Sequence, residues 1–183
     1  MASLQTTPGP RPNGKRALII TGPGVEDAEF LYPYYRLVEA GFHVDVATKD
    51  AAEVKGKHGV PIKANVDAAT IPDTEYDLVL VPGGHEAPDR VRQIPRVLSF
   101  VKQMHDKGKV IAAVCHGPQV LISAGILRGR RVTCYPGCKD DVINAGAKYE
   151  ATPVVVDGNL VTSPHFRDMA PWMAAVIKAC GAT

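Results

Sequence analysis

The chain has 183 residues, of which 45% are hydrophobic and 22% charged, with 21 Lys and Arg against 19 Asp and Glu. A chain of this length buries roughly 70% of the surface that its unfolded form exposes, so we expect one sizeable core without disulfide staples. The charge balance excludes the strong field of a protein that binds nucleic acid or an anionic membrane, and no apolar run reaches the roughly 20 residues of a spanning helix.

Residues 1–14 are rich in proline and glycine and have no apolar periodicity, so we interpret them as a flexible tail. This start lacks the basic and apolar regions of a signal peptide, which predicts a cytoplasmic protein. In that reducing compartment the four cysteines should be free thiols. Residues 15–183 are expected to form a single domain.

From residue 15 onward, apolar strands alternate with helices. Strands are predicted over residues 17–20, 44–48, 78–81 and 110–114, with helices over residues 26–40 and 94–107 between them. Strands that are apolar almost throughout are typical of a parallel sheet covered by helices on both faces. Glu26 and Asp27 suit the positive end of the first helix.

The second half of the chain adds a helix over residues 117–124, a strand over residues 131–134 and helices over residues 139–145 and 170–180. Residues 154–161 form two β-rich runs around Asp157-Gly158, a sequence preferred in type I′ turns. The chain is therefore predicted to form a flavodoxin-like three-layer α/β/α sandwich, with a mostly parallel sheet and a C-terminal β-hairpin extension.

Ligands of open α/β sheets bind outside the carboxyl ends of the strands, where three predicted loops over residues 22–29, 83–89 and 115–117 lie. Cys115 falls at the corner between a buried strand and a helix, as in a nucleophile elbow with Cys in place of Ser. Small residues at Ala113 and Gly117 let the turn close. The helix N-terminus predicts that the pKa of the thiol is lowered. The alternative is an inert buried cysteine.

Several residues near this corner are candidates for binding or proton transfer. The N–H groups of Gly84 and His116 are predicted to hold an oxyanion if the three loops converge. His116 is also a candidate base, although a Cys-His dipeptide alone is a weak signal. His85 is a candidate for lining the pocket. His165 is a candidate second base, with a substrate contact or a surface position as the alternative.

Cys134 and Cys138 lie four residues apart without a second cluster at zinc spacing, so they are interpreted as packing residues and no metal is expected. Neither a P-loop nor a dinucleotide-binding fingerprint is present, because the glycines at Gly22 and Gly24 lack the required spacing. We therefore expect no cofactor.

Five motifs follow one another along the chain: EDAE (26–29) before YP (32–33), PGG (82–84), AVCHGP (113–118), YPG (135–137) and KDDVINAG (139–146). Together they resemble the PfpI intracellular-protease branch of the DJ-one superfamily, from Lys15 to about Cys180. The resemblance implies a class I glutamine amidotransferase-like fold. Tyr135 of the YPG motif is assigned to substrate binding, together with Gly84, His85 and His165.

The resemblance also implies that Cys115 is the reactive thiol, that His116 is its neighbour and that Glu29 is a carboxyl group close to the sulfur. By the same resemblance, Asp89 is the acid that a neighbouring subunit contributes to His116, within a homodimer or homohexamer. This chain departs from that pattern, because the loop over residues 84–89 is one residue longer and carries Asp in place of Glu.

Glu29 has a physical interpretation of its own. A carboxyl group beside a thiolate in a partly dry pocket is held neutral, and it can then donate a hydrogen bond to sulfur or move a proton. The alternative is an ordinary carboxylate in the first turn of a helix.

Three functions remain open. The leading hypothesis is a cofactor-independent enzyme of stress defence in which Cys115 attacks a small reactive carbonyl, similar to a glyoxalase III that converts methylglyoxal to lactate. The second is an intracellular cysteine peptidase in which His116 is the base and Asp89 of a neighbouring subunit orients it. The third is a non-enzymatic redox sensor whose Cys115 becomes a sulfinic acid stabilised by Glu29.

Overall fold

The computed structural model describes residues 13–182, so residues 1–12 of the expected tail lie outside the described part of the chain. Its main sheet has seven strands in the order β10-β11-β7-β6-β1-β2-β5. All neighbouring strands are parallel except the antiparallel pair β10 and β11. The strands are β1 (Arg16–Ile20), β2 (His43–Thr48), β5 (Val66–Asp67), β6 (Leu78–Val81), β7 (Val110–Val114), β10 (Val155–Asp157) and β11 (Leu160–Ser163).

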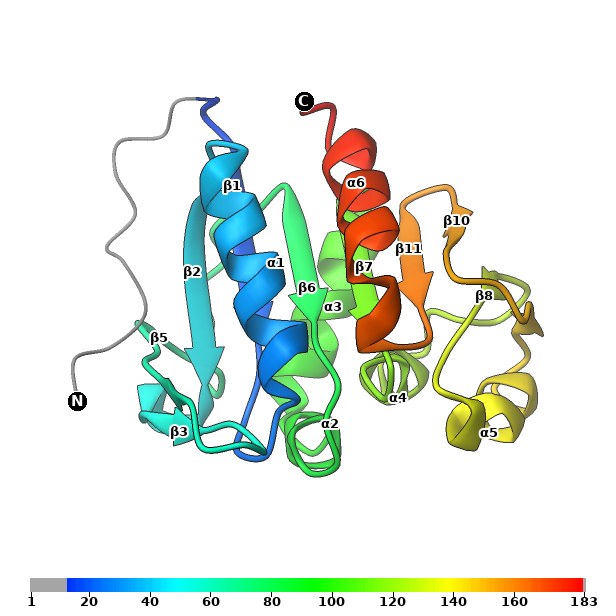
Figure 1. Cartoon of the computed structure of the whole chain (residues 1–183), viewed down its shortest axis with the longest axis horizontal. Coiled ribbons are helices and arrows are strands. Elements are labelled where there is room, and N and C mark those ends of the chain that lie inside the picture. Colours follow the sequence, from blue (N-terminus) through cyan, green and yellow to red (C-terminus); the bar gives the residue numbers. More distant parts are fainter. Residues whose placement is uncertain (1–12, 183) are drawn as a thin grey trace.

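Helices cover both faces of this sheet (Figure 1). On one face lie α1 (Asp27–Glu39) and α6 (Met169–Ala179), and on the other lie α3 (Pro95–Asp106) and α4 (Pro118–Ser123). Successive side chains of a strand point to opposite faces, and β1 follows this rule. Ala17 and Ile19 pack with α1 and α6, whereas Leu18 and Ile20 pack with α3 and α4. The predicted three-layer α/β fold is confirmed.

The hairpin that extends the sheet has a different turn from the one predicted. Asp157 pairs with Leu160, so Gly158 and Asn159 form the turn. Gly158 has a φ of 57°, whereas Asn159 is outside the positive-φ region, so the predicted type I′ turn is wrong and a type II′ turn fits. The side chain of Asn159 donates to the backbone oxygens of His105 and Lys109, which ties the turn to the start of β7.

Several short elements depart from the predicted pattern. The strand predicted over residues 131–134 is only β8 (Arg131–Val132), which pairs with β9 (Lys148–Tyr149) in a separate sheet. It ends because the Thr133 N–H donates to the side-chain oxygen of Thr162 rather than to a neighbouring strand. The elements absent from the prediction are β3 (Val54–Lys55), β4 (Pro61–Ile62), β5, β9, α2 (Ala87–Val91) and the short helical turns η1 (Lys49–Ala51), η2 (Pro136–Cys138) and η3 (Phe166–Asp168). The predicted short helix is α5 (Lys139–Asn144).

The four cysteines are free, and Cys134 and Cys138 are buried in the core on the α3 side of the sheet, as their interpretation as packing residues predicted. Within residues 13–182, none of the helices has the length and apolar character that crossing a membrane requires.

Candidate active site

Cys115 lies at a sharp backbone corner between β7 and α4. Its φ is 60°, in the left-handed region, where a non-glycine residue costs roughly 1–2 kcal/mol. The Cys115 N–H donates to the Ser163 oxygen at 2.9 Å, and the Cys115 oxygen accepts from the Tyr135 N–H at 2.9 Å. A Cβ on Gly117 would lie 2.3 Å from the Val81 oxygen. The chain therefore has the geometry of a nucleophile elbow, and Gly117 is needed to close it.

Three loops converge on this corner. A Cβ on Gly83 would lie 2.6 Å from Glu29 Oε2, 2.7 Å from Cys115 Cβ and 2.8 Å from the His116 nitrogen. Gly84 has a φ of 101°, and its Cβ would lie 2.4 Å from the Gly24 oxygen. Only glycine therefore fits at both positions, and the absence of a side chain at Gly83 and Gly84 lets the three loops come together as predicted.

Glu29 is a fully buried carboxyl group in the first turn of α1. Its Oε2 accepts a hydrogen bond from the Gly83 N–H at 2.9 Å, whereas Oε1 is buried and has no hydrogen-bond partner of ordinary geometry. Burial raises the pKa of Glu29 from 4.5 to about 7, against the opposing effects of Cys115 and the Gly83 N–H. Glu29 can therefore hold or release a proton near neutral pH.

The Cys115 thiol interacts directly with Glu29 and with two backbone N–H groups. Burial raises the pKa of the thiol, and the Glu29 charge raises it further, whereas hydrogen bonds from the Gly84 and His116 N–H groups lower it. The net direction is upward, so the predicted low thiol pKa is wrong. Only 8% of the residue is exposed, and the loss of hydration outweighs the effect of the short helix α4.

His116 is placed against both the thiol and an aromatic side chain. Its Nδ1 lies 3.2 Å from Cys115 Sγ, so these adjacent side chains point toward each other. Burial lowers the pKa of the imidazole, as do the charges of His85 and Lys57. The ring stacks on Tyr135 with centroids 4.7 Å apart and an angle of 24° between the planes. A neutral imidazole with a fixed ring can accept a proton from sulfur.

His165 lies behind Tyr135, with the two ring centroids 6.2 Å apart. Its Nδ1 accepts a hydrogen bond from the Arg167 N–H at 3.3 Å, which caps the turn η3. The half-exposed Phe166 ring lies 4.2 Å from the His165 ring. His165 therefore belongs to a row of rings beside the site, and one of its nitrogens is already engaged.

The two candidate residues that follow Gly84, His85 and Asp89, are exposed to solvent. Asp89 is exposed on α2, and its Oδ2 lies 3.4 Å from Gln93 Nε2. Within one chain, the structure does not bring Asp89 to His116. His85 is also exposed, but its Cε1 lies 3.5 Å from the position of a Cβ on Gly24, and its charge acts on His116.

Residues 56–60 contact the start of α1, and sequence reasoning missed them. The charge of Lys57 acts on both Glu29 and His116. The Asp27 carboxylate accepts hydrogen bonds from the His58 N–H at 2.8 Å and the Val60 N–H at 3.0 Å. Glu26 Oε2 lies 3.2 Å from Lys57 Nζ. Glu26 and Asp27, which we interpreted as acids that suit a helix start, are therefore buried anchors for this segment. The sequence offers no signal for this role, because both acids also suit an ordinary helix start.

Within residues 13–182, the structure places no group of three or more His, Cys, Asp or Glu side chains where they could hold a metal ion.

Comparisons with known proteins agree with this geometry. A family model described as the DJ-1/PfpI family matches residues 15–179. The chain is 44% identical to "Deglycase PH1704" of Pyrococcus horikoshii over 89% of this chain and 98% of that protein. It is 37% identical to "Putative cysteine protease YraA" of Bacillus subtilis, over 81% of this chain and 88% of that protein. The crystal structure of Drosophila melanogaster DJ-1beta superposes with a TM-score of 0.84 at 30% identity, covering 91% of each chain.

The family match spans almost the whole described chain, and the relatives share most of its length at substantial identity. The cysteine elbow, the buried glutamate and the Gly-Gly loop all lie within the matched residues. This chain belongs to the DJ-1/PfpI family.

Proposed function

We propose that this chain is a cofactor-independent cysteine enzyme that acts on small reactive carbonyls, with methylglyoxal as the model substrate. The observation that carries the proposal is the Cys115 thiol beside a buried Glu29 carboxyl whose pKa is about 7. A 44% identical relative is named a deglycase, which supports carbonyl chemistry at this position.

The first step is addition of the Cys115 sulfur to the aldehyde carbon of methylglyoxal. His116 takes the thiol proton, and the new alkoxide is held by the Gly84 and His116 N–H groups. The His116 imidazolium then gives this proton to the alkoxide, which yields a neutral hemithioacetal. Ionised Glu29 then removes the proton on that carbon and returns it to the adjacent carbonyl carbon through an enediol. The product is a lactoyl thioester, and water hydrolyses it to lactate and the free thiol.

Lactate formation from methylglyoxal without glutathione tests this proposal. Wild type is expected to form lactate, and Cys115→Ser is expected to lose at least about 100-fold in rate because the nucleophile is absent. Cys180→Ser is the matched control, since Cys180 lies at the end of α6. Equal background rates for wild type and Cys115→Ser would refute the proposal.

The same assay separates free carbonyls from their adducts with amines. Methylglyoxal is incubated with N-acetylarginine, and the concentrations of the free aldehyde and of the early adduct are followed by NMR. A rate that follows the free aldehyde indicates a glyoxalase, whereas a rate that follows the adduct indicates a deglycase.

A cysteine peptidase is a second candidate, favoured by the 3.2 Å separation between Cys115 Sγ and His116 Nδ1 and by the 37% identical relative named a putative cysteine protease. In this case Asp89 of a neighbouring subunit would orient His116. Cleavage of a fluorogenic peptide should then be lost in Asp89→Asn and in the separated monomer. Cleavage by a folded monomer would rule this mechanism out.

A further inference from the structure

A row of rings begins beside the Cys115 thiol. His116 lies next to the sulfur, Tyr135 stacks on His116, and His165 and Phe166 continue the row. In this order the centroids of neighbouring rings are 4.7, 6.2 and 4.2 Å apart. Rings at these separations are in contact with one another, so the ring row is a continuous aromatic wall that starts at the nucleophile.

The segments that carry the outer rings are hydrogen-bonded to Cys115 itself. The Tyr135 N–H donates to the Cys115 oxygen, and the Cys115 N–H donates to the oxygen of Ser163, the last residue of β11. Figure 1 shows β11 beside β7, and the two strands pair in parallel, so the elbow and His165 follow neighbouring strands at the same end of the sheet. The ring row therefore has a fixed position relative to the thiol.

The ring row exposes large aromatic side chains to solvent. Tyr135 is 37% exposed and Phe166 is 42% exposed, whereas the other three phenylalanines of the chain are at most 3% exposed. The turn η3 holds Phe166 in this position, because the Asp168 N–H donates to the His165 oxygen at 3.0 Å. Burial of such rings is favourable, so their exposure beside a reactive thiol points to contact with a ligand.

The charges near the ring row favour a neutral ligand group. The guanidinium carbon of Arg167 lies 5.9 Å from the centroid of the Phe166 ring, and the charge of Lys57 acts on His116 at the other end of the row. These two cations repel a flat cationic group such as a guanidinium. An anion is also disfavoured, because the faces of aromatic rings are negative. A neutral aryl group is repelled by neither.

We propose that the ring row holds a neutral aryl group of the substrate, so that the site prefers aryl-substituted 2-oxoaldehydes to methylglyoxal. The reaction rests on the carbonyl function proposed above, whereas binding of the aryl group does not. Phenylglyoxal is the model substrate. Its ring is joined to the aldehyde carbon through one carbonyl carbon, which keeps the ring beside the thiol, where His116 and Tyr135 are the nearest rings of the row.

Ketones that lack the aldehyde test the binding without the reaction. Acetophenone has a flat ring, cyclohexyl methyl ketone has the same number of carbons in a puckered ring, and acetone has no ring. In NMR titrations of the labelled full chain, acetophenone is expected to shift the amide signals of His116, Tyr135 and Phe166. It is expected to bind at least about fivefold more tightly than cyclohexyl methyl ketone, and acetone is expected to bind more weakly than both.

Variants locate the binding. Tyr135→Leu is expected to weaken acetophenone at least about fivefold, and Phe166→Leu, at the outer end of the row, about twofold. His165→Asn removes a ring but keeps an acceptor for the Arg167 N–H, and about threefold weaker binding is expected. Tyr32→Leu is the matched control, because Tyr32 is 38% exposed on α1 and lies outside the row. It is expected to bind acetophenone like wild type.

Turnover tests the preference for aryl substrates. Phenylglyoxal and water give mandelate by the same steps that give lactate from methylglyoxal, with the proton of the aldehyde carbon returned to the adjacent carbon and no oxidant consumed. The ratio of kcat/KM for phenylglyoxal to kcat/KM for methylglyoxal is expected to be at least about 10 in wild type. In Tyr135→Leu it should approach one, mainly through a higher KM for phenylglyoxal.

The two measurements separate failure of the aryl site from failure of the carbonyl function. If neither lactate nor mandelate forms, the carbonyl function is wrong, and the ketone titrations still decide whether the ring row binds an aryl group. Equal binding of acetophenone and cyclohexyl methyl ketone would overturn the aryl site. Acetophenone binding that survives both Tyr135→Leu and His165→Asn would do the same, as would a kcat/KM ratio at or below one in active wild type.

Discussion

The carboxyl group of Glu29 is fully buried, and its burial makes the free energy of unfolding depend on pH. Its pKa is about 7 in the folded chain against an ordinary value of 4.5, so the folded state binds more protons than the unfolded state between these values. The stabilisation is fully present below pH 4.5 and is lost as the pH rises through 7. One pKa unit corresponds to about 1.4 kcal/mol, so the loss is on the order of 3 kcal/mol.

Glu29→Gln should remove this dependence, because the amide does not titrate. Denaturant unfolding of wild type and variant between pH 4.5 and 8 measures it, and the difference between their unfolding free energies should shift by about 3 kcal/mol in favour of the variant as the pH rises. Curves that run parallel over this range would contradict a buried carboxyl group with a raised pKa.

At the residue scale, the sequence was enough to predict the position of Cys115 but not the direction in which its pKa shifts. Cys115 was placed by the abrupt change from an apolar strand to a helix, which is visible along the chain. The direction of its thiol pKa was predicted wrongly, because burial is decided by loops that are distant in sequence. The burial of the Glu29 carboxyl group and the packing of residues 56–60 against α1 likewise depend on contacts that no local pattern records.

At the element scale, the elbow depends on one glycine, Gly117, which lies between β7 and α4 and packs against β6. A Cβ on Gly117 would lie 2.3 Å from the Val81 oxygen and 2.9 Å from the Val114 oxygen, and both are backbone atoms of sheet strands that cannot turn aside. We therefore expect Gly117→Ala to cost about 3 kcal/mol of unfolding free energy.

Gly22→Ala is the matched control for Gly117→Ala. Its Cβ would have no contact closer than 3.7 Å and its φ is not positive, so a change within about 1 kcal/mol is expected. Denaturant titration of both variants checks the contrast. Equal losses at the two positions would show that the tight approach of β6 to the elbow does not limit stability.

Long buried strands were predictable and short elements were not. Strands β1, β6 and β7 read as apolar runs because helices cover both faces of the sheet. The strands β3, β4 and β5 have two residues each and α2 has five, which is too short for a periodic pattern. The predicted turn was wrong because the Asn159 side chain donates hydrogen bonds to the backbone oxygens of His105 and Lys109. These bonds compete with the preference of Asp-Gly for the two central positions of a turn.

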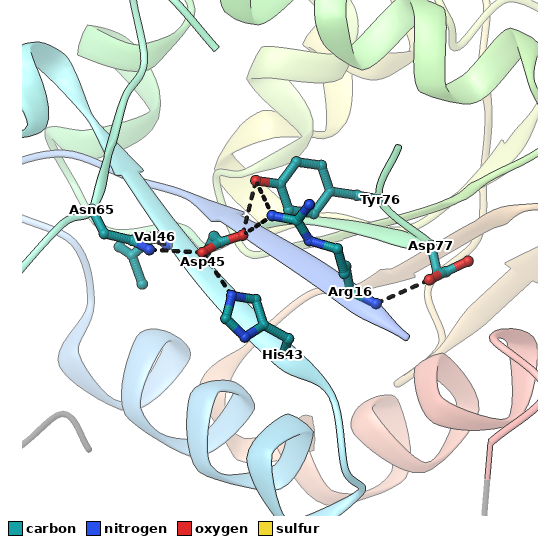
Figure 2. Close-up of polar contacts among 7 residues, drawn as sticks. All are labelled: Arg16, His43, Asp45, Val46, Asn65, Tyr76 and Asp77. Carbon is teal, nitrogen blue, oxygen red and sulfur yellow. Dashed lines mark hydrogen bonds and ion pairs between the residues drawn. The ribbon is translucent and has the colours of Figure 1, made fainter. Parts of the chain in front are cut away.

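At the scale of the whole molecule, the two edges of the sheet are specialised differently. The carboxyl edge, where the parallel strands end, holds Cys115 and the converging loops. The amino edge, where these strands begin, holds a polar network centred on the buried Asp45 (Figure 2). Asp45 accepts hydrogen bonds from Arg16 Nη2 at 2.7 Å, Asn65 Nδ2 at 2.7 Å and the Tyr76 hydroxyl at 3.0 Å, and His43 Nε2 lies 3.2 Å away. These groups come from β1, β2 and the segments before β5 and β6, so one carboxylate joins four parts of the chain.

The charge of Asp45 should therefore affect stability without affecting catalysis. Burial opposes its ionisation, but the hydrogen bonds of Arg16, Asn65 and Tyr76 outweigh burial and lower the pKa. The stabilisation is thus present above the ordinary pKa of an aspartate and is lost as the pH falls through the lowered value.

Asp45→Asn leaves the half-buried Arg16 guanidinium without its counter-charge, so we expect a loss of about 2 to 3 kcal/mol near neutral pH. Asp73→Asn breaks an exposed pair with Arg96 and is expected to cost less than about 1 kcal/mol. Denaturant unfolding compares the two, and the proposed lactate formation, measured per folded molecule, should match wild type in both, because Cys115 lies at the other edge of the sheet. A lower rate in folded Asp45→Asn would mean that the amino edge also shapes the catalytic loops, and a small loss of stability would mean that the network adds little to the fold.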